Sequence, residues 1–144
     1  MASRKVPKSA PVRASLWPST LEPVAGMDFK KFLQDQAGDL KRLVNDAFDA
    51  SVEMRIVEDV ISHNFVIVLP RQDYRYQLFS LRTIGDGFPV RIIAPHMPEP
   101  LQVIPVHGKD ELETELRRMF HHESTLRVVN WLADEARSDV VEGG

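Results

Sequence analysis

The sequence predicts an α+β fold: an antiparallel meander of four or five strands, flanked by one N-terminal helix and two C-terminal helices. Apolar residues between 28 and 49 recur at helical spacing, and helical spacing returns after residue 110. Between them, short apolar or alternating segments are separated by turn residues. Because short turns favour antiparallel pairing, we expect the helices to cover one face of the sheet and to leave the other uncovered.

The first helix is the clearest of these signals. Phe29, Leu33, Leu40, Leu43 and Phe48 belong to one apolar stripe that runs through residues 28–49. Asp28 stands where a side chain can cap the helix by accepting a backbone N–H.

The strands follow with less uniform signals. Residues 52–60 alternate as a strand does but also repeat as a helix does, and we favour a strand because Val and Ile are enriched there. We read Ser62–Asn64 as a turn and 65–69 as a strand buried on both faces. Strands are also expected at 74–83, 88–94 and 101–106, and Pro105 places the last of them at a sheet edge or ends it early.

Two helices complete the domain. Asp110 and Glu113 have the spacing of a capping box at the start of one, and Ser124 is placed to cap the other. Leu112 and Leu116 supply the buried stripe of the first, whereas Leu126 and Val129 supply that of the second.

Length and composition indicate one domain. The chain has 144 residues, of which 43% are hydrophobic, enough for a core of its own. We divide it into a basic Pro/Ser-rich arm (1–26), a single α+β domain (27–138) and a loose tail (139–144). The absence of cysteine excludes disulfides and thiolate metal sites. No apolar segment has the length of a membrane span or a signal sequence, so we expect no membrane association and a cytoplasmic location.

Charge is unevenly distributed. The arm carries Arg4, Lys5, Lys8 and Arg13 against a single acidic residue, whereas the whole chain has a net charge of −3. The acidic body disfavours nucleic acid on average and suits a basic protein partner. The arm itself offers phosphate contacts.

Signals for catalysis are weak. The sequence has no nucleophile motif and no phosphate-binding glycine loop, and the neighbours His121, His122 and Glu123 point in different directions on a helix. We therefore expect no cofactor, no metal and no catalytic residue. A metal-assisted hydrolase using Asp and His side chains is kept as a second alternative.

The segment Tyr74-Arg75-Tyr76 raises a first alternative, nucleic-acid binding. Aromatic and arginine side chains on a strand can stack on bases and pair with phosphates. Arg82 and Arg91 would extend such a surface if they share a face with it. Because side chains alternate along a strand, however, Arg75 is expected on the other face of the strand from both tyrosines.

Protein binding is the function we favour from sequence. Tyr, Trp and Arg are enriched in protein interfaces, and Trp131 lies off the predicted buried stripe of the last helix. It is expected either to meet a partner or to fill a gap against the first helix. The resulting hypothesis is a small non-enzymatic interaction module, such as an adaptor, an accessory or chaperone-like protein, or an antitoxin or immunity-type inhibitor. Its partner is a protein or a second copy of the chain.

Overall fold

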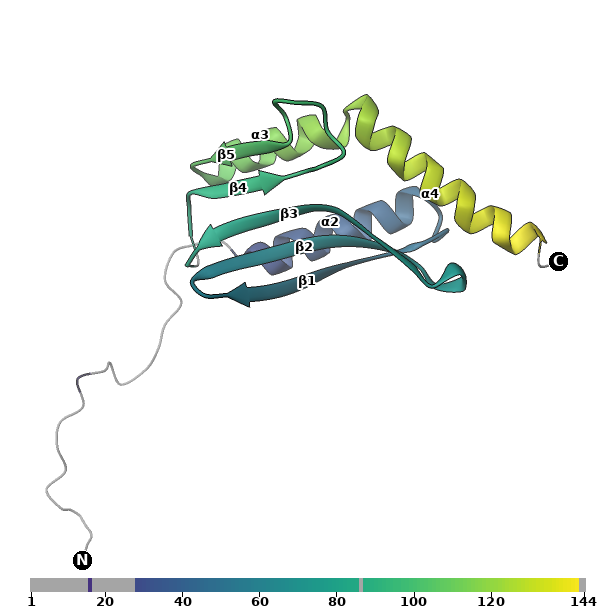
Figure 1. Ribbon diagram of the computed structural model, residues 1–144, viewed down its shortest axis with the longest axis horizontal. Helices are drawn as coiled ribbons and strands as arrows, with labels where there is room; N and C mark the ends of the chain where they lie inside the picture. The colour runs from purple at the N-terminus through teal and green to yellow at the C-terminus, as the bar shows by residue number, and fades with distance from the viewer. Residues whose placement is uncertain (1–15, 17–27, 86, 143–144) are drawn as a thin grey trace, which may run out of the picture.

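The computed structural model describes residue 16 and residues 28–85 and 87–142, with side chains described as far as 138. It confirms the α+β arrangement (Figure 1). The predicted arm lies outside the described residues, apart from Leu16. The elements in chain order are α2 (Phe29–Leu43), β1 (Asp49–Val57), β2 (Val60–Leu69), the 3₁₀ turn η1 (Pro70–Gln72), β3 (Tyr74–Ile84), β4 (Val90–Ile93), β5 (Val103–Val106), α3 (Lys109–Phe120) and α4 (Glu123–Glu142). Helix α4 therefore continues past residue 138, where we expected the domain to end.

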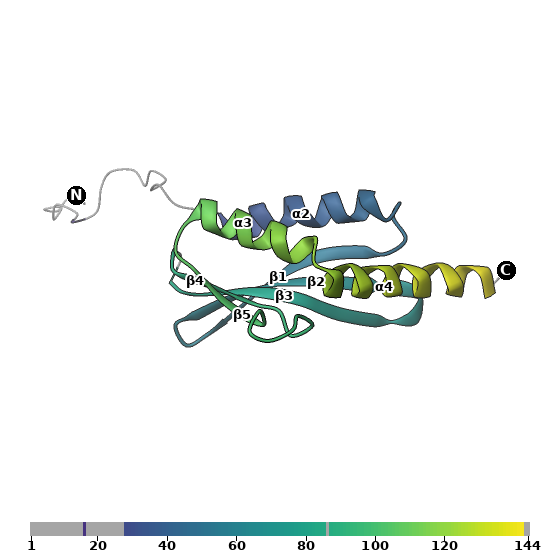
Figure 2. The same cartoon turned by 90° about the horizontal axis from the view of Figure 1, so that it is seen from above.

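The five strands form one antiparallel sheet in the order β1-β2-β3-β4-β5. All three helices lie on the same side of this sheet (Figure 2). Strand β5, which contains Pro105, is an edge strand as predicted. We call the side of the sheet opposite the helices the open face.

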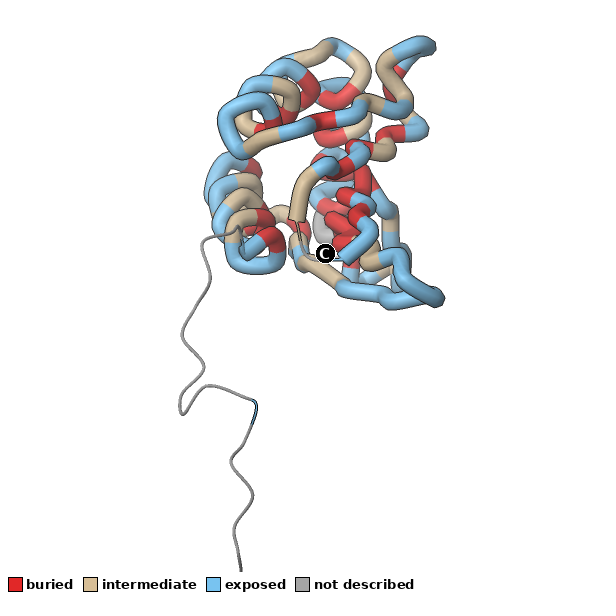
Figure 3. Tube along the Cα trace, turned by 90° about the vertical axis from the view of Figure 1, so that its left-hand side faces the viewer, coloured by how far each residue is buried: buried red, intermediate tan, exposed pale blue. Residues whose placement is uncertain are grey.

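The core fills the space between helices and sheet, where buried residues concentrate (Figure 3). At its centre the rings of Phe65 on β2 and Phe79 on β3 stack with centroids 5.0 Å apart. Phe120 at the end of α3 packs on Phe79 with a centroid distance of 5.7 Å. These contacts join β2 and β3 to the end of α3.

Helix α2 begins as predicted and ends earlier. Asp28 caps it, because its Oδ1 accepts the backbone N–H of Lys31 at 3.0 Å. The prediction that the helix extends to residue 49 is wrong: Asn45 and Asp46 take left-handed φ values of 55° and 59°, which end a helix and which Asn and Asp tolerate. Phe48 keeps helical spacing in the sequence, yet the turn carries it into the core, where it is 2% exposed.

The predicted turn at Ser62–Asn64 is also wrong. These residues lie within β2, and the β1–β2 hairpin instead turns at Glu58 and Asp59, with Glu58 at φ 56°. The strand accommodates these polar residues because each makes a specific contact. The ring centroid of His63 lies 5.9 Å from that of Phe29, and Ser62 Oγ donates to Asn64 Oδ1 at 2.7 Å.

Both predicted caps of the C-terminal helices are replaced by other groups. Gly108 is the N-cap residue of α3, and Glu111 Oε1 accepts the backbone N–H of His107 at 2.8 Å. In front of α4, the Nδ1 atom of His122 accepts the N–H of Ser124 at 3.0 Å. The capping-box prediction at Asp110 fails because the N-cap position lies two residues earlier, at Gly108.

Candidate functional site

Strand register determines which side chains share the open face, because residues paired across an antiparallel sheet point to the same side. One row of pairs joins Arg55 on β1 to Ser62 on β2, Arg82 on β3 and Arg91 on β4. The next row towards the hairpin tip joins Val57, Val60 and Ile84. We call Arg55, Arg82 and Arg91 the arginine row, and the other three residues the apolar row.

A β-bulge creates this alignment. Phe65 pairs with Phe79 and Val66 with Gln77, so Leu78 is an extra residue on β3. Arg75 and Arg82 are an odd number of residues apart and would point to opposite faces of a regular strand. The extra residue brings both to the open face, together with Arg91.

The arginine row is exposed and carries uncompensated charge. Among the described residues, none of its three guanidinium groups forms an ion pair within 4.0 Å. Arg82 and Arg91 lie directly opposite each other across β3 and β4. Like charges in that position destabilise a sheet, and an anion bound between them would turn the repulsion into attraction.

A hollow of about 390 Å³ lies on the open face beside this row. Arg55 and Arg82 flank it, and Glu58 at the hairpin turn contributes one carboxylate. The rest of the lining consists of polar groups from Ser62, Asn64 and Gln77 and apolar surface from Val57 and Val60. A carboxylate is the planar anion that guanidinium groups pair with bidentately. The hollow therefore has the chemistry to receive an acidic side chain that has an apolar neighbour.

The apolar row borders the hollow. Val57 is 57% exposed, Val60 38% and Ile84 80%. Single exposed apolar residues are ordinary, but three in one row, next to a row of free charges, form an amphipathic surface.

Other side chains of the open face are paired with one another or buried. The guanidinium of Arg75 on β3 pairs with the carboxylate of Glu53 on β1, so the ion pair crosses above β2. Val66, beneath it on β2, is only 3% exposed although it faces away from the helices. In the part of the chain that the structure describes, the buried hydroxyl of Ser80 has no hydrogen-bond partner.

The other sequence-predicted site residues are dispersed. Tyr74 and Tyr76 pair with the core residues Leu69 and Ile67, so they lie on the helix side of the sheet, away from the arginines. Burial raises the pKa of the Tyr76 hydroxyl. The arm residues Arg4, Lys5, Lys8 and Arg13 lie outside the described residues.

Trp131 on α4 packs edge-on against Tyr74 at a centroid distance of 6.4 Å and is 48% exposed. Sequence offered two alternatives for this side chain, contact with a partner or a gap against the first helix. The ring contact with β3 differs from the second alternative, and contact with a partner stays a prediction.

Sequence reasoning did not single out Arg55, Val57, Val60 or Ile84. The alternation of residues 52–60 indicated part of this surface, since a strand there places Arg55 and Val57 on one face. Their alignment with Arg82 depended on the hairpin turn and the bulge.

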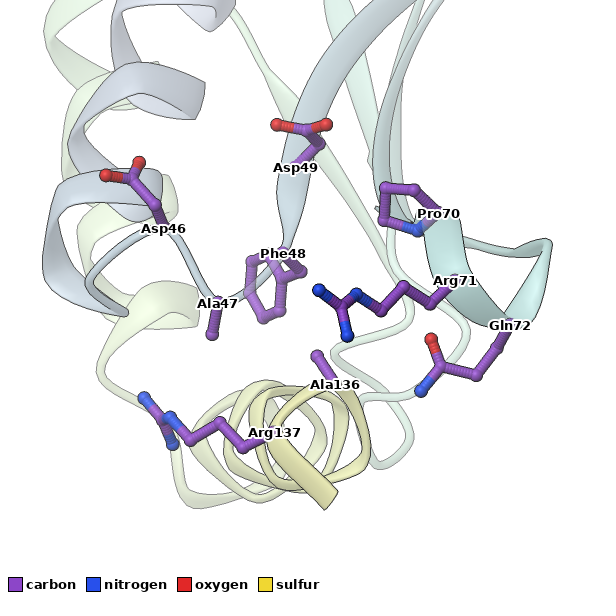
Figure 4. Close-up of a pocket in the computed structure, with 9 residues that line it drawn as sticks. All are labelled: Asp46, Ala47, Phe48, Asp49, Pro70, Arg71, Gln72, Ala136 and Arg137. Atoms are coloured by element: carbon purple, nitrogen blue, oxygen red, sulfur yellow. The ribbon is translucent and has the colours of Figure 1, made fainter. Parts of the chain in front are cut away.

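A cavity of about 590 Å³ lies between the start of β1, η1 and α4 (Figure 4). Arg71 extends into it towards Phe48, and Gln72 and Arg137 line it from either side. The polar groups of the latter two are engaged: Gln72 Nε2 donates to the carbonyl of Glu135 at 2.9 Å, and Arg137 donates to that of Val44 at 3.3 Å. These bonds tie α4 to η1 and to the end of α2, so we interpret this cavity as a structural junction.

A smaller apolar groove of about 160 Å³ separates α2 from α4. Phe65, Leu78 and Phe120 contribute to its lining, and Leu43 and Leu126 lie at its sides. The helical stripes predict both leucines as buried, yet they are 74% and 44% exposed. The reason is that α2 and α4 both pack on the sheet without closing over the groove.

Two of the histidines, His63 and His96, are partly or wholly buried in the fold. Nε2 of His96 lies 2.7 Å from the hydroxyl of Thr125, and burial lowers the pKa of His96. Burial likewise lowers the pKa of His63. No group of three or more potential metal ligands gathers among residues 16, 28–85 and 87–142.

Comparison with known proteins adds no functional information. None of the described helices is both long and apolar enough to span a bilayer. No protein-family model, curated protein or solved structure matches this chain.

Proposed function

We propose that this protein is a non-enzymatic interaction module that binds an acidic segment of a partner protein across the open face of its sheet. The observation that carries the proposal is the arginine row, three exposed guanidinium groups without ion pairs among the described side chains, beside the apolar row. Carboxylates of the partner pair with the arginines, while an apolar side chain next to them packs on Val57, Val60 and Ile84.

The sign of the local charge decides the kind of partner. The chain as a whole has a net charge of −3, which on its own favours a basic partner. A bound partner, however, interacts mainly with the charges close to its docking surface, because salt screens charges beyond about 8–10 Å. The positive open face therefore selects an acidic ligand in spite of the acidic average.

Nucleic acid is the competing ligand, since arginines also bind phosphates. Binding of single strands relies on aromatic rings that stack on bases. Both tyrosines, which were expected to supply such rings, lie on the helix side of the sheet. This placement favours a protein ligand.

Capture from a lysate of the source organism, treated with nuclease, tests the proposal. Immobilised wild-type protein is compared with Arg82→Glu and Arg91→Glu. Arg127→Glu is the matched control, because Arg127 is an exposed arginine of α4, a helix that lies on the other side of the sheet (Figure 2). We expect a stoichiometric acidic protein that the control retains and both row variants lose. Binding that disappears with nuclease, or that survives both row variants, contradicts the proposal.

A further inference from the structure

Strand β1 forms one edge of the sheet, and no described strand pairs with its outer side. It is nine residues long, Asp49–Val57. A long exposed edge is a ready template for another strand. It also exposes apolar side chains, since Met54 is 52% and Ile56 60% exposed.

The hairpin geometry tells which backbone groups point outward. Val57 and Val60 pair across a two-residue turn, and such flanking residues exchange hydrogen bonds with each other. Alternation then directs the backbone groups of the odd-numbered residues of β1 towards β2. Those of Ala50, Val52, Met54 and Ile56 point away from the sheet and are available to a further strand.

We propose that this edge binds a second copy of the chain, by antiparallel pairing of β1 with the partner's β1 about a two-fold axis at Met54. Met54 then lies opposite the partner's Met54, and Val52 lies opposite the partner's Ile56. These are the residues whose backbone groups point outward, so the pairing completes their hydrogen bonds. A two-fold contact of this kind is closed and uses the same surface on both copies.

Charge favours this register over those one residue away. With the axis at Met54, Glu53 lies opposite the partner's Arg55, and the same contact occurs twice by symmetry. Moving the axis by one residue places either Glu53 or Arg55 opposite its own copy, which is unfavourable. The contact at Met54 is self-complementary in charge, and it covers the exposed side chains of Met54 and Ile56.

The consequence is one continuous sheet with both open faces on the same side. Because Arg55 then faces the partner's Glu53, Arg82 and Arg91 of the two copies would form the bivalent surface, which raises avidity for a partner with two acidic segments. Dimerisation itself does not depend on the ligand proposed above, so either proposal can fail without the other.

Complementary charge variants of the full chain test the contact by sedimentation velocity. Glu53→Arg places two arginines at each contact, and Arg55→Glu places two carboxylates there. We expect each variant alone to raise the dimer Kd by at least about tenfold, about 1.4 kcal/mol. An equimolar mixture restores opposite charges at both contacts, so it should dimerise about as well as the wild type. A monomeric wild type, or a mixture that stays monomeric, overturns the proposal.

Disulfide trapping tests the register independently, because the chain has no cysteine. In the proposed contact, Met54→Cys places two thiols directly opposite each other, with Cα atoms about 5.5 Å apart, within disulfide range. Ile56→Cys is the matched control: it lies on the same strand and face, but its two copies are separated by roughly 14 Å, too far to bridge. We expect oxidation to cross-link the first variant and not the second. Equal cross-linking of both variants overturns the register.

Discussion

Arg75 on β3 and Glu53 on β1 form an ion pair that passes over β2, the strand between them. The pair links two strands that share no backbone hydrogen bonds, and it shields Val66 on the otherwise uncovered face of the sheet. It also engages one arginine of the open face and leaves Arg55, Arg82 and Arg91 for a ligand. The proposed function depends on this difference: one arginine pairs within the sheet, and the other three have no ion pair among the described residues.

The energy of this pair is expected to be small. The two side chains are 53% and 43% exposed, and exposed ion pairs are worth about 0.2–1 kcal/mol. A double-mutant cycle with Arg75→Ala and Glu53→Ala, measured by urea unfolding, should give a coupling in that range. The coupling should decrease at high salt. A coupling that is large and insensitive to salt would show that the pair is far better shielded than its exposure indicates.

Ser80→Ala is expected to leave the stability unchanged or to raise it by up to about 1 kcal/mol. The Ser80 hydroxyl is fully buried and has no hydrogen-bond partner among the described residues, and such an orphaned group costs about 1–3 kcal/mol. Urea unfolding of the variant measures the change. A clear loss of stability would mean that this hydroxyl has a partner after all.

The stacked pair of Phe65 and Phe79 should be the most sensitive part of the core. Phe79 is 0% exposed and contacts both Phe65 and Phe120, so Phe79→Ala should cost about 3–5 kcal/mol. Ile84→Ala on the same strand is the control, because Ile84 is 80% exposed and little burial is lost. Chemical denaturation of both variants checks the contrast, which equal losses would contradict.

Stability should decrease as the solution becomes acidic. Burial holds the pKa of His63 and of His96 below 6.5 in the folded chain, so the unfolded chain binds more protons below pH 6.5. The stabilisation is therefore complete above pH 6.5 and is lost as the pH falls towards the lowered values.

Thermal unfolding between pH 7.5 and pH 5 measures this loss. His63→Phe should reduce the dependence of Tm on pH because it removes one of the two groups. The exposed-site variant His121→Gln should keep most of the dependence, since it retains both. An unchanged profile for His63→Phe would rule out His63 as a source.

The sequence was sufficient for the fold class because helical and alternating periodicities are local properties. The stripe from Phe29, the cap at Asp28 and the strand at 65–69 could all be read from neighbouring residues. The end of α2 could not be read in this way, because Phe48 keeps helical spacing while Asn45 and Asp46 break the helix.

The open face was predictable only in part. Arg82 and Arg91 were singled out, but their alignment with Arg55 depends on a bulge at Leu78 and on a turn at Glu58. Neither feature leaves a local pattern in this sequence. Exposure of Leu43 and Leu126 was equally unpredictable, since it follows from the spacing of two helices that are distant in the chain.

The most direct test of the proposed function combines binding and stability in Arg91→Glu. This variant removes the repulsion between Arg82 and Arg91, so it should be more stable than the wild type by about 0.2–1 kcal/mol. Binding is followed by NMR titration with a peptide of alternating Glu and Leu residues, and with a thymidine oligonucleotide as the competing ligand. We expect the peptide to shift the resonances of Arg55, Arg82 and Ile84 in the wild type. Its affinity for Arg91→Glu should be lower by at least about tenfold, although that variant is the more stable protein. Peptide binding equal in both proteins, or shifts caused by the oligonucleotide alone, would contradict an acidic protein segment as the ligand of this face.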